Sequence, residues 1–122
     1  FPALPGAGAL YSTAPDLLRF LDANLGRAEP QLVRALQRTH APQARAGRRS
    51  VGLGWLRSEA RGGPLLWCAS ALGGYSGFLG LAPAAGVGLV LLSDHGPSAL
   101  ARLLRRRPLE SAGLALLAHH AA

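Results

Sequence analysis

The first third of the chain carries apolar side chains at helical spacing. In STAPDLLRFLDANLG the leucines and the phenylalanine fall on one stripe and the charged residues elsewhere, which predicts an amphipathic helix. Thr13 can cap this helix, Pro15 suits its first turn and Gly26 can end it. A second helix is predicted over about residues 30–40, where Leu and Val recur at the same spacing. Helices are therefore expected over about residues 13–40.

From Val51 onward the pattern changes to short apolar segments separated by Gly and Pro. The segments VGLGWL, PLLWCA, YSGFLGLA and VGLVLLS predict four consecutive strands over about residues 51–93, and their short links favour antiparallel pairing. Residues 83–86 predict a tight turn between the last two strands. Because VGLVLLS is apolar on both faces, we expect a central strand covered on both sides. The preceding stretch 42–50, rich in Arg, Pro and Gly, is predicted to be an exposed connector.

Two prolines precede helical stretches near the end of the chain. Pro97 opens one through about Arg106 and Pro108 opens another, so terminal helices are expected over about residues 97–120. This order of elements predicts an α+β fold with an antiparallel β-sheet flanked by helices. At 49% hydrophobic residues, the whole chain, residues 1–122, is expected to form one compact domain.

Charge narrows the range of chemistries. All 13 basic residues are Arg and Lys is absent, which excludes a lysine nucleophile or base because a guanidinium keeps its proton near neutral pH. The net charge is +7, but the Arg are scattered and aromatic residues make up only 6%, so no nucleic-acid partner is expected. The dense group within 102–107 is typical of solvated charges at a helix C-terminus, with an acidic partner or membrane surface as the alternative. No membrane span is expected, because the longest apolar run falls far short of about 20 residues.

The single cysteine and the histidines predict neither a disulfide nor a metal site. Cys68 has no base beside it in the sequence and is interpreted as a packed strand residue, not a nucleophile. His119 and His120 point about 100° apart on a helix, unlike a metal-binding pair at spacing i, i+4. No cofactor or metal is therefore expected.

Four stretches together carry a resemblance to a known family. They are PGAGALYSTAPDLLRF, VGLGW, WCASALGGYSGFLGLAP and GVGLVLLSD, and their order and spacing agree over about residues 3–95. The chain resembles the C-terminal portion of serine β-lactamase-related hydrolases, the class C and penicillin-binding-protein-like group that includes D-alanyl-D-alanine peptidases and esterases. The resemblance implies the C-terminal part of the β-lactamase/transpeptidase-like fold and hydrolysis of an amide or ester through an acyl-serine.

The same resemblance shows what this sequence lacks. The family attacks with the serine of a Ser-x-x-Lys motif and uses a Tyr-x-Asn motif for proton transfer, and neither motif occurs here. The resemblance therefore implies that an N-terminal half of the domain carries the nucleophile and that the substrate is peptide-like or an ester. The compartment is not indicated, since a periplasmic or secreted protein would carry its export signal upstream.

The third motif of the family is degenerate in this sequence. Cys68 stands where the family has Lys or His, Ala69 where it has a small hydroxyl or amide residue, and Ser70 where it has Gly. A neutral thiol cannot replace the cation that holds a substrate carboxylate. The resemblance implies that the backbone N–H of Ala71 is the surviving oxyanion-hole donor, because a backbone donor does not depend on the lost side chains.

Three further residues, Gly73, Gly74 and Tyr75, correspond to the rim of the family's site. Two functions follow from the resemblance: part of a serine hydrolase whose nucleophile lies upstream, or a non-catalytic pseudoenzyme that uses the same fold for binding or scaffolding. An unrelated Arg-rich binding module is the third alternative, and it would make the four ordered matches accidental.

Overall fold

The computed structural model describes residues 10–47, 49–98 and 108–121. Three helices and a six-stranded sheet account for most of them. The elements in chain order are α1 (Ala14–Asn24), α2 (Pro30–His40), β1 (Ala44–Ala46), β2 (Arg49–Val51), β3 (Leu56–Ala60), β4 (Gly63–Leu72), β5 (Tyr75–Ala82), the short 3-10 helix η1 (Pro83–Ala85), β6 (Val87–Ser93) and α4 (Pro108–His120). This arrangement confirms the predicted α+β fold.

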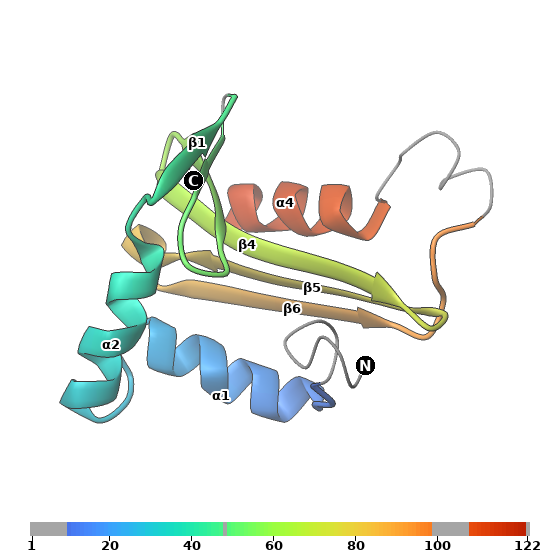
Figure 1. Ribbon diagram of the computed structural model, residues 1–122, viewed down its shortest axis with the longest axis horizontal. Coiled ribbons are helices and arrows are strands. Elements are labelled where there is room, and N and C mark those ends of the chain that lie inside the picture. Colours follow the sequence, from blue (N-terminus) through green and yellow to red (C-terminus); the bar gives the residue numbers. More distant parts are fainter. Residues whose placement is uncertain (1–9, 48, 99–107, 122) are drawn as a thin grey trace.

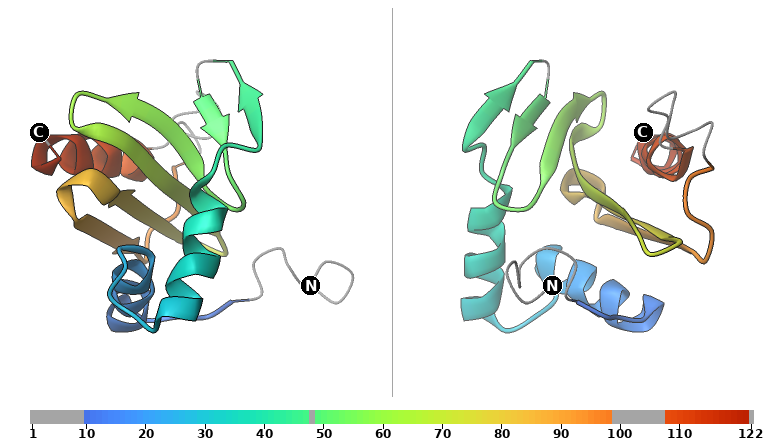
Figure 2. Two further views of the ribbon diagram at one scale, coloured as in Figure 1. Left: turned by 90° about the vertical axis from the view of Figure 1, so that its left-hand side faces the viewer. Right: turned by 45° about the vertical axis from the view of Figure 1, so that its right-hand side comes forward.

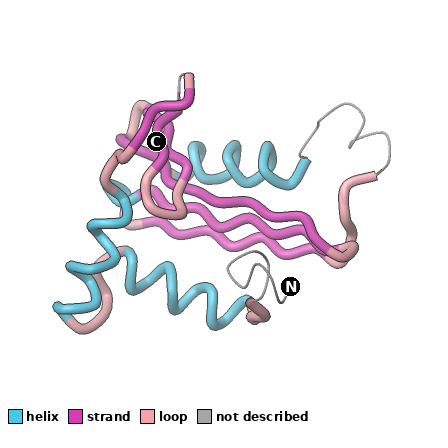
Figure 3. The backbone as a smooth tube through the Cα atoms, in the orientation of Figure 1, coloured by secondary structure: helices cyan, strands magenta, loops and turns pink. Residues whose placement is uncertain are grey.

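The sheet is antiparallel throughout and follows the chain order β1-β2-β3-β4-β5-β6. β4, β5 and β6 run side by side as its longest part, joined by tight turns (Figure 3). Helices α1 and α4 lie on opposite faces of these strands (Figures 1 and 2). The result is a helix–sheet–helix layering in which each sheet face has its own core.

Alternation along the strands divides the apolar side chains between the two cores. On the α1 face, Leu66 of β4 and Leu81 of β5 pack with Leu21 of α1 and with Trp55. On the α4 face the buried cluster is Leu65, Ala82, Leu117 and Ala121. Successive residues of β4, β5 and β6 therefore point alternately toward α1 and toward α4, and this decides where the motif side chains lie.

A polar network joins α1, α2 and the turn before β3. Asn24 is only 2% exposed; its Nδ2 donates to the Phe20 carbonyl at 2.8 Å and its Oδ1 lies 2.8 Å from His40 Nε2. Because the amide nitrogen is committed to Phe20, the amide oxygen accepts from the Nε2–H of His40. Burial lowers the pKa of His40, which favours the neutral ring.

The end of α2 also directs the chain out of the sheet before β3. The Thr39 carbonyl accepts from Leu53 N at 2.9 Å, and the indole N–H of Trp55 donates to Thr39 Oγ1 at 3.2 Å. Gly52 is required at this approach, since a Cβ there would lie 2.4 Å from the Thr39 carbonyl oxygen.

The structure corrects three of the strand predictions. The stretch 42–50 is not only a connector, because it contains β1 and part of β2. VGLGWL is not one strand: β2 ends at Val51 and β3 begins at Leu56, continuing into residues that were not predicted as strand. Within the described sheet β6 pairs only with β5, so it is an edge strand and not a central one, although α1 and α4 both contact it.

The predicted terminal helices have separate outcomes. The second is confirmed as α4 (Pro108–His120), and the turn at 83–86 is confirmed as η1 followed by Gly86 in the left-handed region. Most of the first, predicted from Pro97 to Arg106, lies outside the described residues, and positions 97–98 are not helical.

Candidate functional site

The last part of β4 has a partner on one side only among the strands that the structure describes. β3 pairs with β4 as far as Trp67, whereas β5 pairs with β4 as far as Leu72. Residues 68–72, the open edge of β4, therefore present unpaired backbone on the β3 side. They include Cys68, Ala69 and Ser70, the three positions predicted to correspond to the third motif.

The hairpin turn decides which backbone groups face this open edge. Gly73 and Gly74 both have positive φ, 61° and 87°, as in the tight two-residue turns between hairpin strands. The pair that flanks the glycines closes the turn by a hydrogen bond. Because bonded and non-bonded pairs alternate along antiparallel strands, Ala69 and Ala71 are in non-bonded pairs with β5. Their N–H and C=O groups consequently point into the open edge.

The side chain of Cys68 points to the α1 face. It packs against the buried cluster that includes Leu21 and Trp55, and burial raises the pKa of the thiol. A raised pKa keeps the sulfur protonated and weakly nucleophilic at neutral pH. Cys68 is therefore a neutral, packed residue, at a position where the resemblance predicts a cation in the family.

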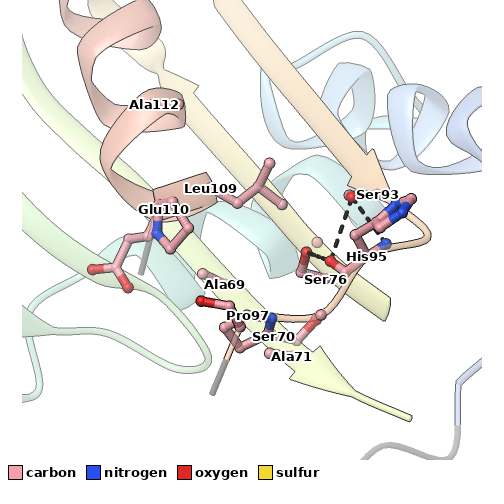
Figure 4. A pocket seen from close by; sticks show the side chains of 14 residues that line it. Ala69, Ser70, Ala71, Ser76, Ser93, His95, Pro97, Leu109, Glu110 and Ala112 are labelled. Carbon is pink, nitrogen blue, oxygen red and sulfur yellow. Dashed lines mark hydrogen bonds between the residues drawn. The ribbon is translucent and has the colours of Figure 1, made fainter. Parts of the chain in front are cut away.

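A cleft of about 790 Å³ lies between the end of β4, the segment after β6 and the start of α4 (Figure 4). Its lining includes Ala69, Ser70, Ala71, Ser76, Leu109 and Glu110. Of the residues predicted for the site, Ala69, Ser70 and Ala71 line this cleft, whereas Cys68, Gly73, Gly74 and Tyr75 do not. The cleft therefore adjoins the open edge but not the Cys68 thiol.

Hydrogen bonds at the cleft hold the segment that follows β6 (Figure 4). The Ser76 hydroxyl donates to the His95 carbonyl at 2.8 Å, and His95 N donates to Ser93 Oγ at 3.1 Å. The His95 ring is largely exposed and lies against the Asp94 carboxylate. Ser76 and Ser93 bond to backbone atoms here, so neither is activated by the imidazole in this arrangement.

The carboxylate of Glu110 has a structural setting at the start of α4. It is buried and lies 3.6 Å from Arg49 Nη1, and the Arg49 guanidinium lies 5.3 Å from the centroid of the Trp67 ring. This contact joins the start of α4 to β2, and it leaves about half of the Arg49 side chain exposed. Within residues 10–47, 49–98 and 108–121, no group of three or more His, Cys, Asp or Glu is placed to hold a metal ion. No described helix is long and apolar enough to cross a bilayer.

The sequence of this chain matches the profile of a known protein family. The profile is that of the Beta-lactamase family, and it matches residues 1–113. The chain belongs to the beta-lactamase family. No curated protein sequence matches it significantly.

Solved structures of beta-lactamase relatives share the fold. A D-alanine carboxypeptidase AmpC from Burkholderia cenocepacia is 22% identical with a TM-score of 0.69, over 90% of this chain and 38% of that one. A beta-lactamase from Sulfitobacter sp. EE-36 is 24% identical with a TM-score of 0.67, over 90% of this chain and 36% of that one. A class C beta-lactamase is 18% identical with a TM-score of 0.68, over 90% of this chain and 34% of that one. The chain thus spans little more than a third of these structures.

Sequence reasoning missed part of the cleft in this beta-lactamase-family chain. Ser76 could have been found, because the Gly73–Gly74 turn places it opposite Ala71. Leu109 and Glu110 could not, since only the folded structure brings the start of α4 beside the hairpin.

Proposed function

We propose that this chain supplies the C-terminal part of a serine hydrolase domain of the beta-lactamase family, with the nucleophile on residues outside the 122. The open edge of β4 carries the proposal. In acyl transfer, a carbonyl oxygen becomes negatively charged and needs a preorganised donor. The Ala71 N–H, directed away from β5 on an edge that no described strand covers, supports this role.

The chemistry proposed for the whole domain is hydrolysis of an amide or ester through an acyl-serine. Ala71 N–H stabilises the oxyanion, and Gly73, Gly74 and Tyr75 form the rim at the hairpin tip, where Tyr75 is 66% exposed. Cys68, Ala69 and Ser70 contribute packing and strand pairing instead of side-chain contacts to substrate. We expect weak binding of a substrate carboxylate, because the neutral Cys68 thiol gives no cation for it.

A pseudoenzyme is the second candidate, and the Cys68 environment favours it. The family cation is replaced by a thiol that faces a hydrophobic core and whose pKa is raised by burial. Such a domain would keep the fold for binding or scaffolding without acyl transfer.

The two candidates differ in whether the full-length protein carries a reactive serine. Incubation with a fluorophosphonate followed by peptide mapping should label one serine stoichiometrically if the protein is a hydrolase. Absence of labelling in folded full-length protein would leave the pseudoenzyme.

Backbone replacement at residue 71 tests the donor itself. Ala71→Pro removes the N–H and should lower kcat for an ester about 10²- to 10³-fold, the usual effect of losing one oxyanion donor. Ala69→Pro is the matched control, because it removes an N–H from the same open edge two residues away. An equal loss in both variants would contradict the assignment to Ala71, and circular dichroism checks that both remain folded.

A further inference from the structure

A row of cationic and hydroxyl side chains crosses the three short strands, away from the open edge. The register places Arg45 of β1 opposite Ser50 of β2, and Ser50 opposite Arg57 of β3. Residues directly opposite on adjacent strands share a sheet face. With strands about 4.8 Å apart, the two Arg backbones are about 10 Å apart, so their long side chains can converge above Ser50.

One of these arginines is held in place and still has donors to spare. Arg57 is 24% exposed, and its Nε and Nη2 donate to the same oxygen, Oε1 of Glu59, at 3.0 and 2.9 Å. A guanidinium has five N–H donors, so those on Nη1 and one on Nη2 are not used by Glu59. Glu59 fixes the plane of Arg57 and leaves one edge of the guanidinium for an anion.

The other arginine on this face lacks an acidic partner. Arg45 is exposed and forms no ion pair with any residue in the part of the chain that the structure describes. Arg49 alternates to the other face, where its guanidinium contacts Trp67 and Glu110, although part of the residue also lines the hollow beside this row. The row therefore holds two positive charges against the single carboxylate of Glu59.

These side chains border a hollow of about 380 Å³, whose lining includes Arg45, Ser50, Arg57 and Glu59, and also Arg49, whose charge is paired with Glu110. We infer that this hollow binds a phosphate-bearing small molecule, with the phosphate between Arg45 and Arg57 and above the Ser50 hydroxyl. Guanidinium groups bind phosphate oxygens in pairs, and a hydroxyl can donate to a further oxygen. A carboxylate has only two oxygens, which one guanidinium satisfies, so the three donor groups fit a phosphate better. The site is independent of the proposed hydrolase function.

The test uses the full-length protein and inorganic phosphate at constant ionic strength. Arginine Nε–Hε signals in ¹H–¹⁵N NMR spectra report each guanidinium, and those of Arg45 and Arg57 should shift saturably with phosphate. Arg45→Gln should weaken binding at least about tenfold, because it removes charge-assisted hydrogen bonds. Ser50→Ala should weaken it about threefold, since a neutral donor contributes less.

Arg34→Gln is the matched control, because Arg34 is an exposed arginine of α2 and its loss changes the charge equally. It should alter the dissociation constant less than about twofold, as expected for a distant, solvated charge. Equal weakening by Arg45→Gln and Arg34→Gln would overturn the proposal by showing attraction to net charge alone. Absence of saturable shifts, or binding to phosphatidic-acid vesicles without binding to soluble phosphate, would overturn it as well.

Discussion

Replacing Gly113 by alanine tests how closely α4 sits on the sheet. A Cβ at Gly113 would lie 2.4 Å from Cδ1 of Phe78, whose side chain is fully buried. The ring has little room to move aside, because a Cβ at Gly80 would lie 2.8 Å from its Cε1 atom. The aromatic ring is therefore enclosed between glycines of α4 and β5.

Two effects of opposite sign decide the outcome. Alanine in place of glycine inside a helix stabilises it by about 1 kcal/mol. Forcing extra atoms into a packed core costs about 1–3 kcal/mol. A contact as short as 2.4 Å with a buried ring places Gly113→Ala at the upper end of that range. We expect a net loss of about 1–2 kcal/mol in the free energy of unfolding.

Urea unfolding followed by tryptophan fluorescence measures this change. Ser111→Ala is the control, since Ser111 is exposed on the same helix and its replacement should change stability by less than about 0.5 kcal/mol. Adding Phe78→Leu to Gly113→Ala should cost less than the sum of the single changes, because the smaller side chain relieves the contact. A Gly113→Ala protein as stable as the parent would refute the close helix–sheet contact.

Four further results are expected. The Cys68 thiol should react with a thiol reagent far more slowly in the native state than after denaturation, because it is packed and its pKa is raised by burial; rapid native modification would restore a nucleophilic role. The free energy of unfolding should decrease as the pH falls from about 6.5 toward the lowered pKa of His40, because the unfolded state binds that proton first. In denaturant titrations, His40→Gln should lack this part of the pH dependence. The 122-residue chain alone should not hydrolyse a chromogenic β-lactam or a p-nitrophenyl ester above background, and stoichiometric fluorophosphonate labelling of any of its serines would contradict this. Alone it should also self-associate or be marginally stable, because no strand in the described part of the chain pairs with the outer edge of β6. A monodisperse monomer in sedimentation, with a reversible thermal transition, would show instead that the chain closes its own core.

The helices were predictable because their signals are local. Thr13 caps α1 through its contact with Asp16 N, and Pro15 and Pro30 stand in the first turns of α1 and α2. β1 and β2 were missed because they are three residues each, too short to show a period, and because Pro42 and Gly47 beside them are typical of loops. VGLGWL was wrongly predicted as one strand because the contact of Leu53 with Thr39 is tertiary.

The position of the candidate site along the chain was predictable from the sequence, but its geometry was not. The motif resemblance pointed to residues 68–71, of which residues 69–71 line the cleft, and the Gly73–Gly74 turn already implied a hairpin with alternating backbone partners. Which sheet face receives Cys68 depends on where α1 and α4 pack, and which edge of β4 stays unpaired depends on where β3 begins. Both are set by contacts distant in sequence.

The end of helix α2 holds the segment before β3 away from the open edge of β4. If β3 extended toward its N-terminus in its existing register with β4, Leu53 would lie opposite Ser70 and Gly52 opposite Ala71. The chain's own strand would then occupy the Ala71 N–H, which is the donor proposed for the oxyanion. Instead, the Thr39 carbonyl accepts a hydrogen bond from Leu53 N, which keeps this segment from pairing with β4. If the end of α2 loosened, residues 52–53 would be able to pair with the open edge of β4. Its backbone donors would then be blocked without any change in the sequence of β4.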